Sequence, residues 1–237
     1  MNLNIITIIP ARGGSKSIPR KNIKMFNGFP LIKYSIDYSK SSNLIQKTIV
    51  STDDDEIASI ARELGAEVPF MRPNSLGGDL VQDYPVTLHA LNAIEELFQA
   101  KVDIIVLLRP TSPLRPASLI ENGVSLLLKD QNATSVRSVS LSKEHPFRQW
   151  CIKDDYITGY SNQLTNELEP YNLPRQELPR VFFQTGDIEI IRRDTLLNGS
   201  ISGKRILPLF IEADKVFDID TQQDFDLAEN NYEKQKQ

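Results

Sequence analysis

Apolar residues follow two alternating patterns along the first 140 positions. Short apolar runs have the length of buried strands and lie at residues 4–9, 48–51, 66–70, 102–108 and 133–139. Between them, apolar residues recur at helical spacing at residues 31–39, 54–64, 84–100 and 117–129. Strands that alternate with helices predict βαβ units. We therefore expect an α/β fold with a mostly parallel sheet and helices on both faces.

This alternation stops between about residues 140 and 180. The segment holds Trp150, three tyrosines and prolines at 170, 174 and 179, and no helix of ordinary length fits it. Beyond it, the pattern predicts strands at 187–191 and 206–210, a helix at 221–232 and a frayed polar end at 233–237. We predict one domain over residues 1–237. An aromatic, proline-rich insertion at about 140–180 is typical of an arm that contacts another subunit or covers a substrate.

Charge is distributed unevenly along the chain. The formal net charge is −4, which argues against a nucleic-acid partner. The first acidic residue is Asp37, however. It is preceded by six cations: Arg12, Lys16, Arg20, Lys21, Lys24 and Lys33. This asymmetry predicts a local electropositive site suited to a small polyanion.

Cysteine and histidine are scarce. Cys151 is the only cysteine, which excludes an intramolecular disulfide and fits a reducing compartment. His89 and His145 are the only histidines, so a His/Cys zinc site is not expected. No stretch of 18 apolar residues and no signal-peptide pattern occurs, and we therefore expect a cytoplasmic protein without a membrane partner.

A glycine-containing basic loop follows the first predicted strand. Gly13 and Gly14 allow a tight turn, and Arg12, Lys16, Arg20 and Lys21 supply charge for a triphosphate. The spacing matches neither the Walker A loop nor the dinucleotide-binding glycine pattern. A solvated basic turn is the alternative. Because ligands of α/β sheets bind at strand ends, we favour a phosphate-binding loop.

A second loop follows the strand predicted at 102–108. Pro110 and Pro113 stiffen it, and its donors are Arg109, Thr111, Ser112 and Arg115. Taken alone, this segment is equally well explained as a binding loop or as a rigid connector from strand to helix.

Two aspartates near the C-terminus form a candidate metal site. On an extended segment, Asp218 and Asp220 face the same way, and paired carboxylates suit Mg²⁺. One alternative is that Asp220 or Thr221 caps the following helix, with Asp224 completing a capping box. A rival carboxylate pair is Asp187 with Glu189. The earlier acidic run at 53–55 is better explained as helix capping.

These motifs, in this order, resemble those of the acylneuraminate cytidylyltransferase family, the CMP-sialic acid synthetases. The resemblance spans nearly the whole chain. It is carried by residues 9–16 with Lys21 and Asn22, by Arg72-Pro73, by residues 109–115 and by residues 217–221.

The resemblance implies a mononucleotide-binding (Rossmann-like) fold, a homodimer built through the inserted arm, and attack of a sugar's anomeric hydroxyl on the α-phosphorus of CTP. It implies a nucleotide site made of Ala11, Arg12, Gly13, Ser15, Lys16, Asn22, Arg72 and Asp79. Lys21, Asp218 and Asp220 would be catalytic, and the two aspartates would hold Mg²⁺. The acidic sugar would be bound by Arg109, Arg148 and Arg175.

The chain departs from the family pattern at three places. Arg109 stands where sialic acid enzymes usually carry glutamine, residues 78–83 replace a hydroxyl-rich stretch, and Thr185-Gly-Asp187 replaces Asn-Gly-Ala. Related acceptors are therefore alternatives: legionaminate, pseudaminate, an octulosonate or a sugar phosphate. A regulatory nucleotide-binding module is the alternative that is not an enzyme, and paired metal carboxylates count against it. A retaining glycosyltransferase usually has Asp-x-Asp in mid-chain, where this chain has Arg109-Pro-Thr.

Overall fold

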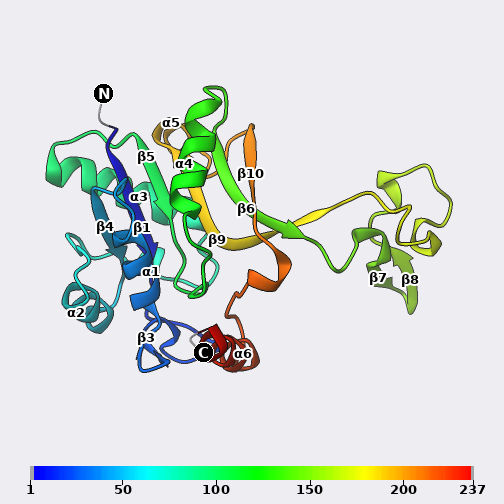
Figure 1. The fold of residues 1–237 in the computed structure, drawn as a ribbon, viewed down its shortest axis with the longest axis horizontal. Coiled ribbons are helices and arrows are strands. Elements are labelled where there is room, and N and C mark those ends of the chain that lie inside the picture. Colours follow the sequence, from blue (N-terminus) through cyan, green and yellow to red (C-terminus); the bar gives the residue numbers. More distant parts are fainter. Residues whose placement is uncertain (1–2, 236–237) are drawn as a thin grey trace.

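A six-stranded sheet forms the centre of the computed structural model, which describes residues 3–235 (Figure 1). The strand order is β10-β6-β9-β5-β1-β4. The strands are β1 (Ile5–Pro10), β4 (Lys47–Ser51), β5 (Ile104–Leu107), β6 (Ser135–Leu141), β9 (Phe182–Arg192) and β10 (Ile206–Phe210). β1 pairs in parallel with β4 and β5, and β6 with β10, whereas β9 runs antiparallel to β5 and β6. The sheet is thus mostly parallel, as predicted.

Helices cover both faces of the sheet, which confirms the predicted fold class. One core cluster joins the sheet to α1 (Ile32–Lys40), α2 (Asp55–Glu63) and α4 (Leu119–Lys129). A second cluster, on the other face, joins it to α3 (Asp83–Phe98) and the short α5 (Arg193–Leu197). The apolar stripes of the predicted helices are the faces that these clusters bury, because an amphipathic helix gains stability by placing that stripe against the sheet.

A third apolar cluster lies beside the sheet. Helix α6 (Gln222–Gln235) packs there against the hairpin of β2 (Met25–Phe26) and β3 (Phe29–Pro30), with Phe26 and Phe225 in edge-to-face contact. The frayed end expected at 233–237 is wrong for residues 233–235, which are helical, and residues 236–237 lie outside the described part of the chain.

The strand predicted at 66–70 is not formed. Only Glu67 pairs with the sheet, in an isolated parallel bridge to Ile49. Pro69 has no amide hydrogen to donate to a ladder, which explains why pairing stops there. The β2–β3 hairpin and α5 were not predicted, because both are too short to show a periodic pattern.

The segment predicted as an arm projects from the sheet on the extensions of β6 and β9 (Figure 1). These strands pair on both sides of a register shift between Arg137 and Val139, and Gly186, at φ 77°, lies on β9 opposite the shift. The arm carries the hairpin β7 (Trp150–Lys153) and β8 (Tyr156–Gly159) and the 3-10 turns Pro146–Arg148, Asn162–Leu164 and Pro170–Asn172. As expected, it contains no helix of ordinary length.

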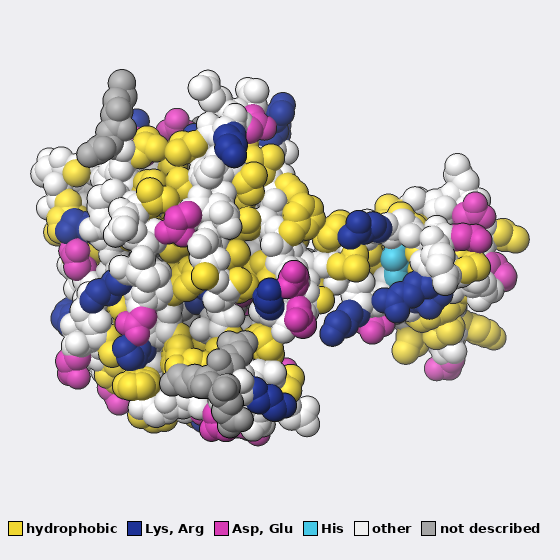
Figure 2. Space-filling model, viewed as in Figure 1, with side chains coloured by type: hydrophobic (Ala, Val, Ile, Leu, Met, Phe, Trp, Pro, Cys, Tyr) yellow, Lys and Arg dark blue, Asp and Glu magenta, His cyan; other side chains and the backbone are white. Residues whose placement is uncertain are grey.

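Hydrophobic side chains are exposed along the arm (Figure 2). Ile152 and Ile157 pair across the hairpin and are 81% and 59% exposed. A role of this surface in dimerisation stays a prediction. Among residues 3–235, no helix has the length and apolar character needed to cross a membrane.

Candidate active site

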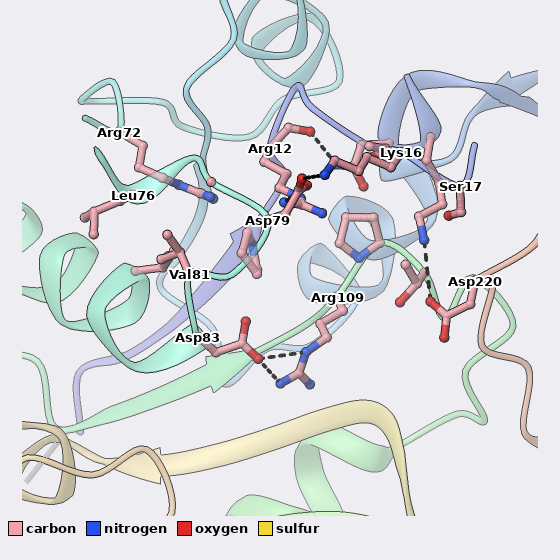
Figure 3. A pocket seen from close by; sticks show the side chains of 18 residues that line it. Arg12, Lys16, Ser17, Arg72, Leu76, Asp79, Val81, Asp83, Arg109 and Asp220 are labelled. Atoms are coloured by element: carbon pink, nitrogen blue, oxygen red, sulfur yellow. Dashed lines mark hydrogen bonds and ion pairs between the residues drawn. The ribbon is translucent and has the colours of Figure 1, made fainter. Parts of the chain in front are cut away.

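A cavity of about 480 Å³ opens at the carboxyl ends of β1 and β5 (Figure 3). β1 lies between β4 and β5, so the chain leaves β1 at a point where the strand order changes direction, a common ligand site in open α/β sheets. The cavity is lined by Pro10, Arg12, Ser15, Lys16, Ser17, Lys21, Asn22, Arg72, Leu76, Gly78, Asp79, Val81, Asp83, Val86, Arg109, Pro110, Thr111 and Asp220. Nine of these are predicted site residues: Arg12, Ser15, Lys16, Lys21, Asn22, Arg72, Asp79, Arg109 and Asp220.

The basic loop begins at the end of β1 and is braced by the acidic residues that follow β4. The Gly13 amide donates to Asp53 Oδ1 at 3.0 Å, and a Cβ at Gly13 would lie 2.6 Å from Asp54 Oδ2. A side chain at this position would require the Asp54 side chain to shift, so glycine permits the close approach. Asp54 also accepts from the Ile57 amide at 2.9 Å as the N-cap of α2, which confirms the capping role predicted for this run. Ala11 is buried and does not line the cavity; its amide donates to Ser51 O.

Two cations of the loop converge on one carboxylate. Arg12 lies 2.6 Å from Asp79 Oδ1, and Lys16 lies 2.5 Å from Asp79 Oδ2 (Figure 3). Hydrogen bonds from Lys16 and Arg12, together with their positive charges, hold the pKa of Asp79 below its usual range. Arg20 forms ion pairs with Asp54 and Glu56 and does not line the cavity, so it braces the loop instead of facing a phosphate.

Lys21 and Asn22 lie on a 3-10 turn, Lys21–Ile23. The Lys21 ammonium donates to Ile219 O at 2.7 Å and lies 3.6 Å from Asp220 Oδ1. Asn22 is buried, and its Nδ2 donates to Arg12 O at 2.9 Å. Asn22 therefore connects the two ends of the basic loop, and Lys21 connects the loop to the C-terminal aspartate segment.

Arg72 lies on the side of the cavity that also has apolar walls. Its guanidinium is buried and donates to Ser51 Oγ at 3.2 Å and to Ser51 O, and burial lowers its pKa. Leu76 and Val86 line the same cavity. An apolar wall with a few fixed donors is typical of a pocket for an aromatic ring.

The predicted aspartate pair flanks a buried residue. Ile219 is in the core, while Asp218 and Asp220 are exposed on either side, which is the alternation of an extended segment. The Ile219 amide donates to Thr111 O at 2.9 Å. Crowding by protein atoms raises the pKa of Asp218 despite its exposure, and the charge of Asp220 adds to the shift. Asp220 lines the cavity, whereas Asp218 is not among its lining residues.

The predicted capping box is present, and it is formed by Thr221 and Asp224 without the side chain of Asp220. Asp224 Oδ2 accepts from the Thr221 amide at 2.7 Å, and the Asp224 amide donates to Thr221 Oγ1 at 3.3 Å. Thr221 and Asp224 therefore start helix α6, so capping and a cavity-lining carboxylate coexist in this segment.

The rival carboxylate pair, Asp187 with Glu189, is buried, and Glu189 is already paired with two arginines. The Glu189 side chain is 2% exposed and accepts from Arg109 at 2.7 Å and from Arg137 at 2.6 Å. Burial raises the pKa of Asp187, whose Oδ2 has no hydrogen-bond partner among the described residues. No cluster of three or more His, Cys, Asp or Glu side chains suited to a metal occurs within residues 3–235.

Arg109 joins the cavity to this buried network. Its Nε donates to Asp83 Oδ2 at 3.2 Å, and its Nη2 bonds both Asp83 and Glu189 (Figure 3 shows the Asp83 pair). Burial alone would lower the pKa of Arg109, but the charges of Asp83 and Glu189 outweigh it and the pKa is raised. Sequence reasoning missed this network. Its signal was the presence of the charged residues Arg137 and Glu189 inside predicted strands.

Arg115, in the same loop, is structural. Its guanidinium is buried and donates to Asp187 O at 2.6 Å and to Ser35 Oγ at 2.9 Å. Burial lowers its pKa to about 10. For this residue the interpretation as a rigid connector holds.

Arg148 and Arg175 lie in the arm and do not line the cavity. The Arg148 guanidinium donates to Leu173 O at 3.0 Å, which fixes it within the arm. The fold of a single chain thus separates these two predicted sugar ligands from the other site residues. The cavity is lined by cations and carboxylates and by no Ser/His or Cys/His pair, a set of side chains suited to a polyanion.

Comparisons with known proteins agree with this chemistry. A family model described as cytidylyltransferase matches residues 6–236. The chain is 32% identical to a CMP-N,N'-diacetyllegionaminic acid synthase of Campylobacter jejuni, over 95% of this chain and 93% of that protein. It is 30% identical to an N-acylneuraminate cytidylyltransferase of Escherichia coli, over 96% of this chain and 52% of that protein. A solved CMP-2-keto-3-deoxy-manno-octonic acid synthetase complexed with CTP has the same fold, with a TM-score of 0.71 at 17% identity over 98% of this chain and 99% of that one.

Proposed function

Since this chain belongs to the cytidylyltransferase family, we propose that it transfers CMP from CTP to the anomeric hydroxyl of a sialic acid-type nonulosonate, with release of pyrophosphate. The observation that carries the proposal is one cavity lined by Arg12, Lys16, Lys21 and Asp220 at the end of β1. Phosphoryl transfer needs charge compensation and alignment of the reacting groups more than a protein nucleophile.

Mg²⁺ is the cofactor that fits this donor set. Asp218 and Asp220 supply hard oxygen ligands on one side of an extended segment, and their mutual repulsion favours a cation between them. Mg²⁺ is commonly held by one or two carboxylates together with substrate phosphates and water, so two carboxylates are sufficient. When bound, the ion would neutralise charge that develops on the phosphate oxygens.

The residues of the chain have separate roles in this reaction. Arg12 and Lys16 hold the phosphates, Asn22 is proposed to contact the ribose, and Arg72 lies near the base. The anomeric hydroxyl oxygen attacks the α-phosphorus, the bond to the pyrophosphate oxygen breaks, and the hydroxyl proton is released. Lys21 stabilises the negative charge that develops on the phosphate oxygens.

The class of sugar is supported by the names of the relatives, which refer to different acidic sugars. A guanidinium grips a carboxylate through two parallel hydrogen bonds, and Arg109, which lines the cavity and pairs there with Asp83, would exchange that carboxylate for the one of the sugar. Arg148 and Arg175 lie in the arm, so we propose that they reach the sugar of a second copy of the chain in a homodimer. The exposed aromatic and aliphatic surface of the arm supports this assembly.

Pyrophosphate release tests the proposal. CTP, UTP, ATP and GTP are each combined with N-acetylneuraminate, N,N'-diacetyllegionaminate, pseudaminate, an octulosonate and a sugar 1-phosphate, and mass spectrometry identifies the nucleotide sugar. We expect CTP and a keto acid sugar to be required together. Turnover with the sugar 1-phosphate alone would contradict the acidic-sugar assignment. Nucleotide binding without turnover in any combination would favour a regulatory module.

A further inference from the structure

Asp79 lies where a phosphate group is expected. Its two carboxylate oxygens are divided between two cations of the basic loop: Oδ1 lies 2.6 Å from Arg12, and Oδ2 lies 2.5 Å from Lys16 (Figure 3). These are the donors that the loop offers to a nucleotide. A phosphate oxygen and a carboxylate oxygen accept the same charge-assisted hydrogen bonds, so the two compete for the same atoms.

We propose that the Asp79 carboxylate occupies a phosphate position between Arg12 and Lys16, and that nucleotide phosphates bind by displacing it. The inference rests on the proposed function, because it takes the basic loop as the phosphate site. It gives Asp79 a role opposite to that of a nucleotide ligand: the residue is an internal competitor that lowers the affinity of the loop for phosphates.

Core packing does not hold the tip of the segment that carries Asp79. Gly77 is closely packed, since a Cβ there would lie 2.3 Å from Asp53 Oδ2. At Gly78 the nearest atom to such a Cβ is 3.5 Å away, in ordinary contact. Leu80, at the tip, is 97% exposed, so displacement of the tip would uncover no apolar surface beneath this side chain. The two ion pairs of Asp79 are therefore what fixes the tip to the basic loop.

Competition of this kind affects ligands unequally. A nucleoside has no phosphate and does not need the two cations, so its binding is independent of Asp79. Phosphates bind only the fraction of the protein in which Asp79 has left the two cations. Every ligand that binds both Arg12 and Lys16 therefore has its affinity reduced by this same fraction. A triphosphate recovers the loss through additional contacts, such as the Lys21 ammonium. The carboxylate thus lowers the affinity of ligands that bind both cations relative to that of a nucleoside, and it leaves the ratio between CTP and a monophosphate that binds both cations unchanged.

Isothermal calorimetry on the full chain tests the inference with inorganic pyrophosphate, CTP and cytidine as ligands. In Asp79→Asn the amide no longer competes for the cations, so pyrophosphate and CTP should bind about three- to tenfold more tightly. Cytidine affinity should not change. Asp37→Asn is the matched control, because it removes the same charge from a surface pair with Lys33, 2.6 Å apart, on α1. It should alter none of the three affinities by more than about twofold.

Weaker or unchanged pyrophosphate binding in Asp79→Asn would overturn the inference, since Asp79 would then be a ligand or a bystander. Asp79→Glu keeps a competing carboxylate and should bind pyrophosphate within about twofold of the native protein. The two proposals fail separately. Tighter pyrophosphate binding in a protein that transfers no CMP would support the competitor and remove the proposed reaction. Unchanged pyrophosphate binding in Asp79→Asn, in a protein that transfers CMP, would support the proposed reaction and remove the competitor role of Asp79.

Discussion

The Lys21 ammonium lies 2.7 Å from the carbonyl oxygen of Ile219, a residue 198 positions away in the sequence. The same ammonium is 3.6 Å from Asp220. One side chain therefore connects the basic loop after β1 to the segment that carries both candidate metal ligands. This contact fixes the distance between the proposed phosphate site and the proposed Mg²⁺ site.

Replacing Lys21 tests that connection. Lys21→Ala should lower kcat/KM. The expected loss of transition-state stabilisation is about 2–4 kcal/mol, the scale for loss of one preorganised charge contact. Circular dichroism should be unchanged, because the backbone turn at 21–23 does not depend on the ammonium. A loss smaller than about tenfold in kcat/KM would mean that the loop is a solvated turn.

Removing a carboxylate charge tests the metal site. Asp218→Asn and Asp220→Asn should each abolish turnover while the fold survives, since an amide is a poor ligand for Mg²⁺. Asp224→Asn is the control, because the Asp224 carboxylate is engaged in the cap of α6 with Thr221. It should cost stability of about 1 kcal/mol and retain the metal dependence. Near-normal activity of Asp218→Asn or Asp220→Asn without added metal would place the site elsewhere.

Glu189 is expected to be essential for stability. Its buried carboxylate accepts from Arg109 and Arg137, so Glu189→Ala leaves two guanidinium groups without this partner. We expect the free energy of unfolding, measured in urea, to fall by about 3–5 kcal/mol. Glu67→Ala, which breaks a surface pair with Lys47, should cost about 0–1 kcal/mol. Equal losses in the two variants would show that the buried network adds nothing.

The raised pKa of Asp187 leads us to expect that the stability of the fold depends on pH. Its folded-state pKa is raised by burial, so the folded protein binds this proton more tightly than the unfolded chain does. Its contribution to stability is present below the unfolded pKa and is lost as pH rises through the folded pKa. Asp187→Asn should therefore raise Tm relative to the native protein more at pH 7.5 than at pH 4, as measured by calorimetry. An identical Tm difference at both pH values would contradict this.

The arm at about residues 140–180 is the predicted dimer contact. Ile152 and Ile157 form an exposed cross-strand pair, so Ile152→Asp with Ile157→Asp should produce a monomer in sedimentation experiments. Activity should fall with it, since Arg148 and Arg175 would no longer reach a second copy. Lys153→Gln on the same hairpin should remain a dimer. A native protein that sediments as a monomer would remove the basis of this prediction.

Local pattern in the sequence was sufficient for much of the fold. Strand and helix periodicity predicted β1, β4, β5 and β6 and their helices, because apolar spacing is decided by neighbouring residues. The position of the basic loop after β1 and the capping role of Asp54 are local for the same reason. The strand predicted at 66–70 failed where one proline interrupted the ladder, which apolar spacing alone does not register.

What the sequence by itself determined is therefore the α/β class, the loops that carry cations and the alternation that puts Asp218 and Asp220 on one side. Only the tertiary structure decided that β9 enters the sheet antiparallel, that Glu189 joins Arg109 to Arg137, and that Asp79 lies between Arg12 and Lys16. The physical reason is separation along the chain. These charge pairs join residues of different elements, and strand order and loop path, which no local periodicity encodes, bring them together.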